Sequence, residues 1–330
     1  MTQKPKCFPS SSIGLNVDIS DNFKGWEQSV SISFDDAFLY GSLINDNSFF
    51  KVLHLCEPTE ILACVDRAIE LKGYYDLILS WNERVLRECP NSKWLGESGC
   101  SWQDRKSSGS PKPLLHFFPG YGLAPLSPVV YDYQSCDVIS KKFGASFLTS
   151  SKGFTSGHRL RQEIYDKLPQ NIGDLKIWKH RSPPRIDDKR TIIEPYQYHI
   201  CPENTRENYY YSEKLIDAFM AKAIPVYYGC SGIGEHFNTD GMILFETCEE
   251  MLSKLSSLTP DYYSNRLPVV EENFKRASVG IRQWDLLEQH ISEGLKKKVR
   301  SISDNLALLQ LSSPKVVVNP RRPPRPLRRP

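Results

Sequence analysis

Short, mostly apolar runs alternate along the chain with apolar residues at helical spacing, a pattern that is typical of α/β proteins. The apolar runs predict strands at 52–55, 77–80, 145–148, 175–178, 196–200, 224–228 and 242–245. The helical spacing predicts helices at 61–71, 160–168, 211–222, 248–257, 260–277 and 281–300. The first forty residues follow neither period. Residues 101–130 are rich in Gly, Pro and Ser and are expected to be a loop.

The alternation predicts an α/β fold class with two Rossmann-like domains that face each other across a cleft. Residues 1–142 are expected to form the first domain and residues 143–300 the second. Residues 301–330 are expected to be a disordered or polyproline II tail, because the Pro- and Arg-rich end of the chain cannot pack a core.

The formal charge of +3 conceals an uneven distribution along the sequence. Residues 313–330 contain Lys315 and five arginines, which leaves a net charge of about −3 on the rest of the chain. The body therefore has no general affinity for polyanions, and no nucleic-acid partner is expected. The tail is interpreted as a solvated extension. It could also bind an SH3-like groove, nucleic acid or, as a peripheral contact, an anionic membrane surface.

Other sequence features indicate a cytoplasmic protein without a metal site. No apolar run approaches the length of a membrane helix, and the N-terminal residues lack the apolar core of a signal peptide. Nine cysteines at irregular spacing, with no CxxC pair, indicate reduced thiols and no structural zinc site.

Charged and amide residues gather where the strand 196–200 gives way to the next helix. Glu203-Asn204 follow the strand, and Glu213-Lys214 open the helix. Ligands of open α/β sheets bind at the carboxyl ends of the strands, and a helix N-terminus favours an anion such as a diphosphate. A lysine on a helix is usually solvated, but a cation at a helix N-terminus is opposed by the dipole unless an anion lies alongside. The pattern therefore predicts a nucleotide-sugar site.

Residues 196–245 resemble the α-1,3-fucosyltransferases, glycosyltransferase family 10. The matching motifs are Glu203-Asn204, then Tyr210-Tyr211-Ser212-Glu213-Lys214, then Ile224-Pro225-Val226 with Gly229. Upstream, LTSSKGFTSGHRLRQEIYDKL (148–168) is similar to the loop and arginine-opened helix of that family. The resemblance covers about residues 143–280, and the absence of a membrane anchor favours a bacterial or viral type of member.

The resemblance implies the GT-B architecture, no essential divalent metal and a role for each of several residues. Donor-binding roles fall on Arg161, Asn204, Tyr210, Glu213 and Lys214. Arg159 is the alternative to Arg161, and three consecutive tyrosines leave the assignment of Tyr210 open. Glu57, which follows the strand 52–55, is the candidate catalytic base, with Glu60 as the alternative.

The implied function is inverting, hexosyl-type transfer of L-fucose from GDP-fucose to a hydroxyl of an oligosaccharide or other glycan, of the α-1,3 type. No cofactor is required beyond the donor substrate. Two alternatives stay open. One is a transferase of the same fold that uses another nucleotide sugar, since a fold does not fix its substrate. The other is a catalytically inactive carbohydrate-binding homologue.

Overall fold

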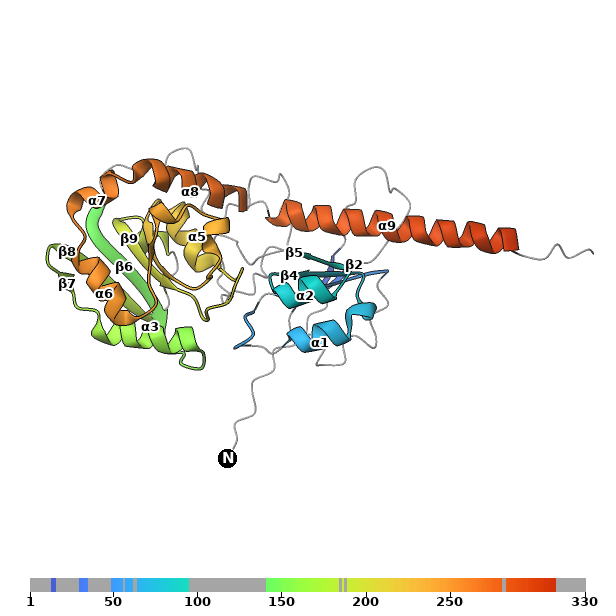
Figure 1. The fold of residues 1–330 in the computed structure, drawn as a ribbon, viewed down its shortest axis with the longest axis horizontal. Coiled ribbons are helices and arrows are strands. Elements are labelled where there is room, and N and C mark those ends of the chain that lie inside the picture. Colours follow the sequence, from blue (N-terminus) through green and yellow to red (C-terminus); the bar gives the residue numbers. More distant parts are fainter. Residues whose placement is uncertain are drawn as a thin grey trace, which may run out of the picture.

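The computed structural model describes residues 13–15, 30–34, 49–55, 57–61, 64–94, 141–183, 186, 189–280 and 283–312. Two separate sheets, each with its own helices, lie side by side (Figure 1). The sheet formed by residues 13–94 belongs to what is called here the first half. The sheet formed by residues 142–244 belongs to the second half.

The first half contains a five-stranded sheet in the order β1-β2-β3-β4-β5. Its strands are β1 Ile13–Leu15, β2 Val30–Phe34, β3 Phe50–His54, β4 Leu77–Ser80 and β5 Ser92–Trp94. Only β1 runs antiparallel to its neighbour. The helices α1, Val65–Glu70, and α2, Glu83–Glu88, follow β3 and β4. All four residues of β4 are buried, as expected for a central strand of a parallel sheet.

The second half contains a six-stranded sheet in the order β11-β10-β9-β6-β8-β7. Its strands are β6 Lys142–Ser150, β7 Asn171–Ile172, β8 Leu175–Ser182, β9 Tyr196–Pro202, β10 Ile224–Tyr228 and β11 Ile243–Leu244. Every pairing is parallel except the short β7–β8 hairpin. The helices are α3 Ser156–Lys167, α4 Arg190–Ile193, α5 Glu213–Met220, α6 Cys248–Ser256, α7 Pro260–Ser264 and α8 Leu267–Gly280.

Two hydrophobic clusters cover the two faces of this second sheet. Ile200 and Val226 belong to the cluster that includes residues of α3 and α6. The next residues along the strands, Cys201 and Tyr227, belong to the cluster that includes residues of α5 and α8. Because successive strand residues point to opposite faces, the sheet is covered by helices on both sides. The loops that follow β6, β9 and β10 lie at the carboxyl ends of these strands.

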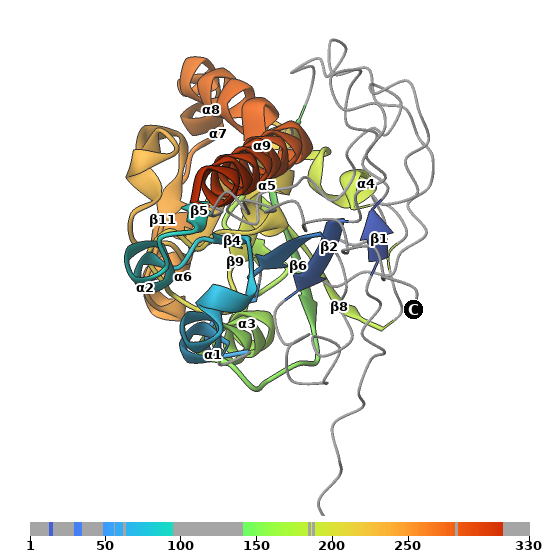
Figure 2. The ribbon, with the colours of Figure 1, turned by 90° about the vertical axis from the view of Figure 1, so that its right-hand side faces the viewer.

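The final helix, α9, Gln283–Ser312, packs on the first half although it follows the second half in sequence (Figures 1 and 2). Lys298 pairs with Asp76 at 2.8 Å, and Ile291 and Leu295 are buried. A Cβ atom at Gly294 would lie 2.5 Å from the Phe50 ring, so glycine permits this close approach.

The end of the chain differs from the prediction in two respects. Residues 283–300 were placed in the second domain but pack on the first sheet. Residues 301–312, expected to belong to the tail, extend the same helix. The segment SISDNLALLQLS contains good helix formers, and Pro314 is the first residue that cannot continue a helix. Residues 313–330, to which the membrane contact was assigned, lie outside the described residues.

Several element boundaries also differ from the prediction. α3 begins at Ser156 rather than residue 160, because the Thr155 side chain caps it by accepting a hydrogen bond from the His158 backbone N–H. The predicted helix 260–277 is divided into α7 and α8. The elements β1, β2, α2, β5, β7 and α4 were not predicted. The predicted loop 101–130 lies outside the described residues.

Candidate functional site

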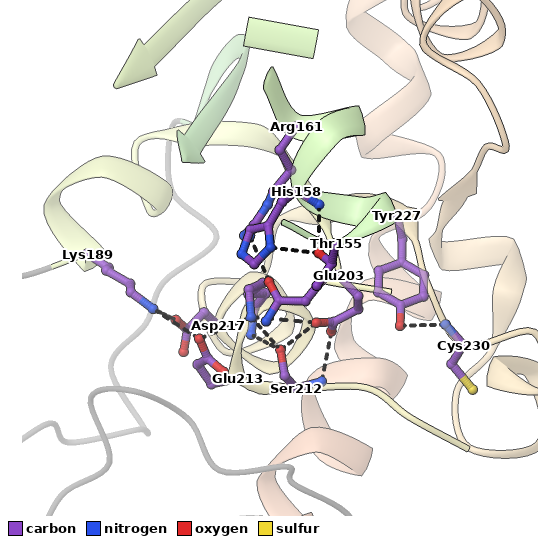
Figure 3. A network of polar contacts seen from close by, with 12 residues as sticks. Thr155, His158, Arg161, Lys189, Glu203, Ser212, Glu213, Asp217, Tyr227 and Cys230 are labelled. Carbon is purple, nitrogen blue, oxygen red and sulfur yellow. Dashed lines mark hydrogen bonds and ion pairs between the residues drawn. The ribbon is translucent and has the colours of Figure 1, made fainter. Parts of the chain in front are cut away.

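The loops at the carboxyl ends of β6 and β9 bring charged side chains together beside the N-termini of α3 and α5 (Figure 3). Glu203 and Asn204 follow β9, Arg161 projects from α3, and Ser212 caps α5 immediately before Glu213 and Lys214. The structure thus brings together four of the five residues predicted to bind a donor. The fifth, Tyr210, lies in the same β9–α5 loop but is oriented toward the first half.

Glu203 is the fully buried centre of this group. Its carboxylate accepts hydrogen bonds from the Ser212 backbone N–H at 2.8 Å and from the Ser212 hydroxyl at 2.6 Å. The Lys214 ammonium lies 3.6 Å from it. Burial raises the pKa of Glu203, against the opposing effects of Lys214 and Ser212. Glu203 therefore fixes both the cap of α5 and the position of Lys214.

Arg161 brings a second cation into the group from α3. It is 7% exposed, and its Nη2 donates a hydrogen bond to the Asn204 side-chain oxygen at 2.7 Å. Its buried Nε has no hydrogen-bond partner in the described part of the chain. Burial lowers the pKa of Arg161, while Glu203 and Glu213 oppose that shift. A buried guanidinium with a donor still free is chemically suited to an oxyanion.

Arg159, the alternative to Arg161, is exposed, and its guanidinium contacts the Phe154 carbonyl. His158, directly before Arg159 on α3, is buried. Its Nδ1 lies 2.6 Å from the Thr155 hydroxyl, and burial lowers its pKa to about 4. His158 is therefore neutral at physiological pH and acts in the capping of α3. Only Arg161 of these three residues places a positive charge inside the group.

Gly157 allows α3 to approach the end of β9. Its backbone N–H donates to the Asn204 carbonyl at 3.0 Å. A Cβ atom at this position would lie 2.1 Å from the Glu203 carbonyl oxygen, far inside van der Waals contact. The absence of a side chain at Gly157 is thus required for Arg161 to reach Asn204 along this path.

Glu213 and Lys214 open α5 and lie partly exposed, with about a fifth of each side chain accessible. The Lys214 ammonium donates to the Ser212 hydroxyl at 3.0 Å and lies 3.5 Å from Glu213. Burial acts to raise the pKa of Glu213, but Lys214 and Lys189 outweigh it, and the net shift is downward. Glu213 is therefore ionised at neutral pH.

Sequence analysis missed Lys189, which lies just before α4. Its ammonium lies 3.1 Å from Asp217 and 3.8 Å from Glu213, so it links two acids of α5. Asp217 is 1% exposed. The signal in the sequence was an acid inside the apolar segment LIDAFM, since a buried carboxylate on a core-facing helix requires a partner.

Lys152, in the loop between β6 and α3, also was missed. Burial lowers its pKa to about 8, and the nearby charges of Arg161 and Lys214 act in the same direction while Glu57 opposes them. Lys152 therefore lies within electrostatic range of the site and of the first half. Glu57, half-buried after β3, is close enough to Lys152 to stabilise its charge.

Glu60, the alternative to Glu57, is held by the second half. Its carboxylate accepts hydrogen bonds from the Ser156 backbone N–H at 2.7 Å, from the Ser156 hydroxyl and from the Thr205 hydroxyl. Burial acts to raise the pKa of Glu60, but these hydrogen bonds outweigh it and lower the pKa. A carboxylate with its oxygens occupied and its pKa lowered is a poor general base.

Tyr210 is 1% exposed, and its ring packs edge-on against Trp81 of the first half, with 5.1 Å between ring centroids. Its neighbour Tyr211 is also buried, whereas Tyr209 is only partly buried and has a positive φ of 60°. Tyr210 therefore joins the two halves through its contact with Trp81.

A scan of the chain against known protein families found no match. Among curated proteins, the α-(1,3)-fucosyltransferase FucT of Helicobacter pylori is 31% identical over 58 residues, which are 18% of this chain and 12% of that protein. The matched segment is thus a small part of the length of that relative.

Two solved structures are similar at low sequence identity. A crystal structure of an α1,3-fucosyltransferase with GDP matches with a TM-score of 0.43 and 16% identity, covering 79% of this chain and 77% of that chain. A structure of Anabaena Alr3699/HepE in complex with UDP and glucose matches with a TM-score of 0.45 and 11% identity, covering 82% and 78%. The chain's own sheets confirm the predicted α/β fold class, because two α/β halves are each built on a largely parallel sheet.

Proposed function

We propose that this chain is an inverting glycosyltransferase that moves L-fucose from GDP-fucose to a hydroxyl of a glycan acceptor, with an α-1,3 type of linkage. Residues 1–142 form the acceptor-side domain in this proposal, and the sheet of the second half forms the donor-side domain. The motif resemblance in residues 196–245 supports fucose and GDP as the donor groups.

The observation that carries the proposal is the buried guanidinium of Arg161 beside Lys214 at the carboxyl end of β9. Arg161 keeps its Nε without a partner in the described residues, and Lys214 lies at the N-terminus of α5. Two cations and a helix N-terminus at one sheet edge suit a diphosphate. The side chains present thus fit the phosphates of a nucleotide sugar.

Each donor-binding residue has a distinct part in the proposed complex. Arg161 and Lys214 bind the phosphates, while Asn204 holds Arg161 and, with Glu213, offers oxygens to ribose or sugar hydroxyls. Tyr210 shapes the loop from its contact with Trp81. Divalent metal is not required, because the two cations supply the positive charge.

The proposed transfer is a single displacement at the anomeric carbon. The acceptor oxygen forms its bond to that carbon while the bond from the carbon to the diphosphate breaks, and the electron pair leaves with GDP. Glu57 takes the proton of the acceptor hydroxyl. Arg161, Lys214 and the N-terminus of α5 stabilise the negative charge that builds on GDP. Glu57 is preferred to Glu60 because the Glu60 carboxylate is already occupied by Ser156 and Thr205.

The two cations recognise a diphosphate and not a particular base, so a donor other than GDP-fucose is the second candidate. Measuring the melting temperature with each of GDP, UDP, ADP and CMP separates a GDP-sugar donor from another nucleotide-sugar donor. A shift with GDP alone supports the GDP-sugar proposal, and equal shifts with all four would contradict it. An assay of fucose transfer from GDP-fucose to a panel of glycans then distinguishes an enzyme from an inactive binding homologue. In an enzyme, Glu57→Gln should abolish transfer while GDP binding is retained.

In the described part of the chain, none of the helices combines the length and the apolar character that a bilayer span requires. A cytoplasmic location, and contact of the 313–330 tail with anionic lipid, are proposals as well. Salt-sensitive binding to phosphatidylserine vesicles that is lost on deletion of 313–330 would support the lipid contact.

A further inference from the structure

Among the described residues, the first half contacts the β9–α5 loop, residues 203–212, at several points. The segments that follow β3 and β4 both reach it. Thr59 donates two hydrogen bonds to Glu207, at 3.0 Å from its backbone N–H and 2.7 Å from its hydroxyl. Asn208 donates to Glu83 at 2.7 Å.

The centre of this contact is the buried aromatic pair Trp81 and Tyr210. Trp81 is 2% exposed and Tyr210 is 1% exposed, with 5.1 Å between ring centroids at an interplanar angle of 65°. Around the pair lie polar contacts that are more exposed, namely those of Glu60, Glu83 and Glu207. A buried aromatic anchor with a polar rim is the usual anatomy of a specific protein interface.

The same contacts flank a strained position in the loop. Tyr209 has φ of 60°, a conformation that a non-glycine residue adopts only when its surroundings impose it. Asn208, directly before it, is held by Glu83, and Tyr210, directly after it, is held by Trp81. The first half therefore supports the strained turn from both sides.

The loop that is held in this way also carries the donor-binding group. It begins with Glu203 and Asn204 and ends with Ser212, which caps α5 ahead of Lys214. Across the same seam, Glu60 binds the N-terminus of α3 through Ser156 and the loop itself through Thr205. Glu57, three residues before Glu60, lies in the turn that these contacts fix.

We propose that Trp81 is a positioning residue that holds the β9–α5 loop in its donor-binding conformation. The hydrogen bonds between Thr59 and Glu207 of the loop assist it. The first half thereby sets the geometry of Asn204 and of the α5 cap, besides presenting Glu57. This inference rests on the proposed function, because it assigns the loop a donor to bind. The loop conformation itself does not depend on the identity of that donor.

Hydrogen exchange of the full-length protein tests the positioning role without any ligand. In Trp81→Leu and Glu207→Gln, amides of residues 203–214 are expected to exchange about three- to tenfold faster, with the larger effect for Trp81→Leu. Trp81→Phe, which keeps an aromatic ring against Tyr210, is expected to restore most of the protection. Phe50→Leu is the matched control, since Phe50 is an equally buried aromatic residue of the same half that packs against α9.

GDP binding by calorimetry is the second measurement, on the same variants. A weakening of about fivefold or more in Trp81→Leu, with little change in Phe50→Leu, is expected. Unchanged exchange of residues 203–214 in Trp81→Leu, or equal acceleration in Phe50→Leu, would overturn the inference. If the wild-type chain binds no nucleotide, the proposed function fails, while the exchange experiment still decides whether Trp81 positions the loop.

Discussion

The two sheets present different chemistry at their carboxyl ends. Directly beyond β9, the residues of the donor-binding group bind one another: Glu203 holds Ser212 and Lys214, and Asn204 holds Arg161. Beyond β3 and β4, the polar residues of the first half bind the opposite half instead. Glu60 reaches Ser156 and Thr205, and Glu83 reaches Asn208.

The donor-binding group is therefore built within the second half alone. The segment of the first half that carries Glu57 and Glu60 is held in place by contacts with the second half. In the second half, Arg161 is buried and Lys214 is partly buried, and both are held by neighbours in the same half, so their arrangement is preorganised. Glu57 lies in a turn that is held by hydrogen bonds to the other half, at Ser156, Thr205 and Glu207. Mutations in the two regions should therefore have different consequences.

The largest effect is expected from removing a cation of the second half. Lys214→Ala should lower turnover by about 10²–10³, because a preorganised charge that stabilises the leaving GDP is lost. Single-turnover transfer from GDP-fucose measures this. Lys254→Ala is the control, since Lys254 is an exposed lysine paired with Glu250 on α6. Equal turnover in Lys214→Ala and the control would rule out the assignment of Lys214.

The next effect is steric and tests how closely α3 must approach β9. Gly157→Ala should lower the free energy of unfolding by about 1–3 kcal/mol and weaken GDP binding, because the new Cβ meets the Glu203 carbonyl. Urea denaturation and calorimetry check the two parts. Gly153→Ala is a matched control in the loop just before α3, where an added Cβ has no atom within 4 Å. Similar losses in both variants would contradict the packing argument.

A smaller effect is expected at Lys189, which links α4 to α5. Lys189→Ala leaves the buried Asp217 carboxylate without this cation and should cost about 1–2 kcal/mol of unfolding free energy, less than a fully buried pair because Lys189 is partly exposed. Adding Asp217→Asn to Lys189→Ala should recover part of that loss. A double variant less stable than the sum of the single variants would refute the pairing.

The smallest effect concerns pH and the first half. The pKa of Glu60 is lowered in the folded protein, so the folded state binds fewer protons than the unfolded state near the ordinary glutamate pKa. Its contribution is present above about pH 4.5 and is lost as pH falls through the folded pKa. Glu60→Gln should flatten the acid limb of the stability curve by a few tenths of a kcal/mol. Parallel wild-type and variant curves between pH 3 and 6 would contradict this.

Sequence patterns predicted most of the second half because its signals are local. The predicted strand 224–228 matches β10 residue for residue, since buried parallel strands are mostly apolar runs. In the first half, the predicted strand 77–80 matches β4 in the same way. Asn204, Glu213 and Lys214 were predicted as site residues because strand end, loop and helix start follow one another in sequence, whereas Arg161 was predicted from the family resemblance. Their shared location then follows from the parallel order of the sheet.

Contacts between distant segments could not be predicted in this way. Trp81 and Tyr210 are 129 residues apart, and nothing in either neighbourhood indicates that the two rings meet. Lys189 lies in a polar loop whose composition does not distinguish a buried ion pair from a solvated charge. The docking of α9 on the first sheet depends on Gly294 fitting against Phe50, a matter of shape that periodicity does not encode.

The most direct test of the central claim is calorimetric titration of GDP into Arg161→Ala and Arg159→Ala. The two arginines lie two residues apart on α3, but only Arg161 is buried against Asn204. The account predicts that GDP binds the wild-type chain and Arg159→Ala with similar affinity and binds Arg161→Ala at least tenfold more weakly. Undiminished GDP binding to Arg161→Ala, or no binding to the wild-type chain, would contradict a diphosphate site at the end of β9.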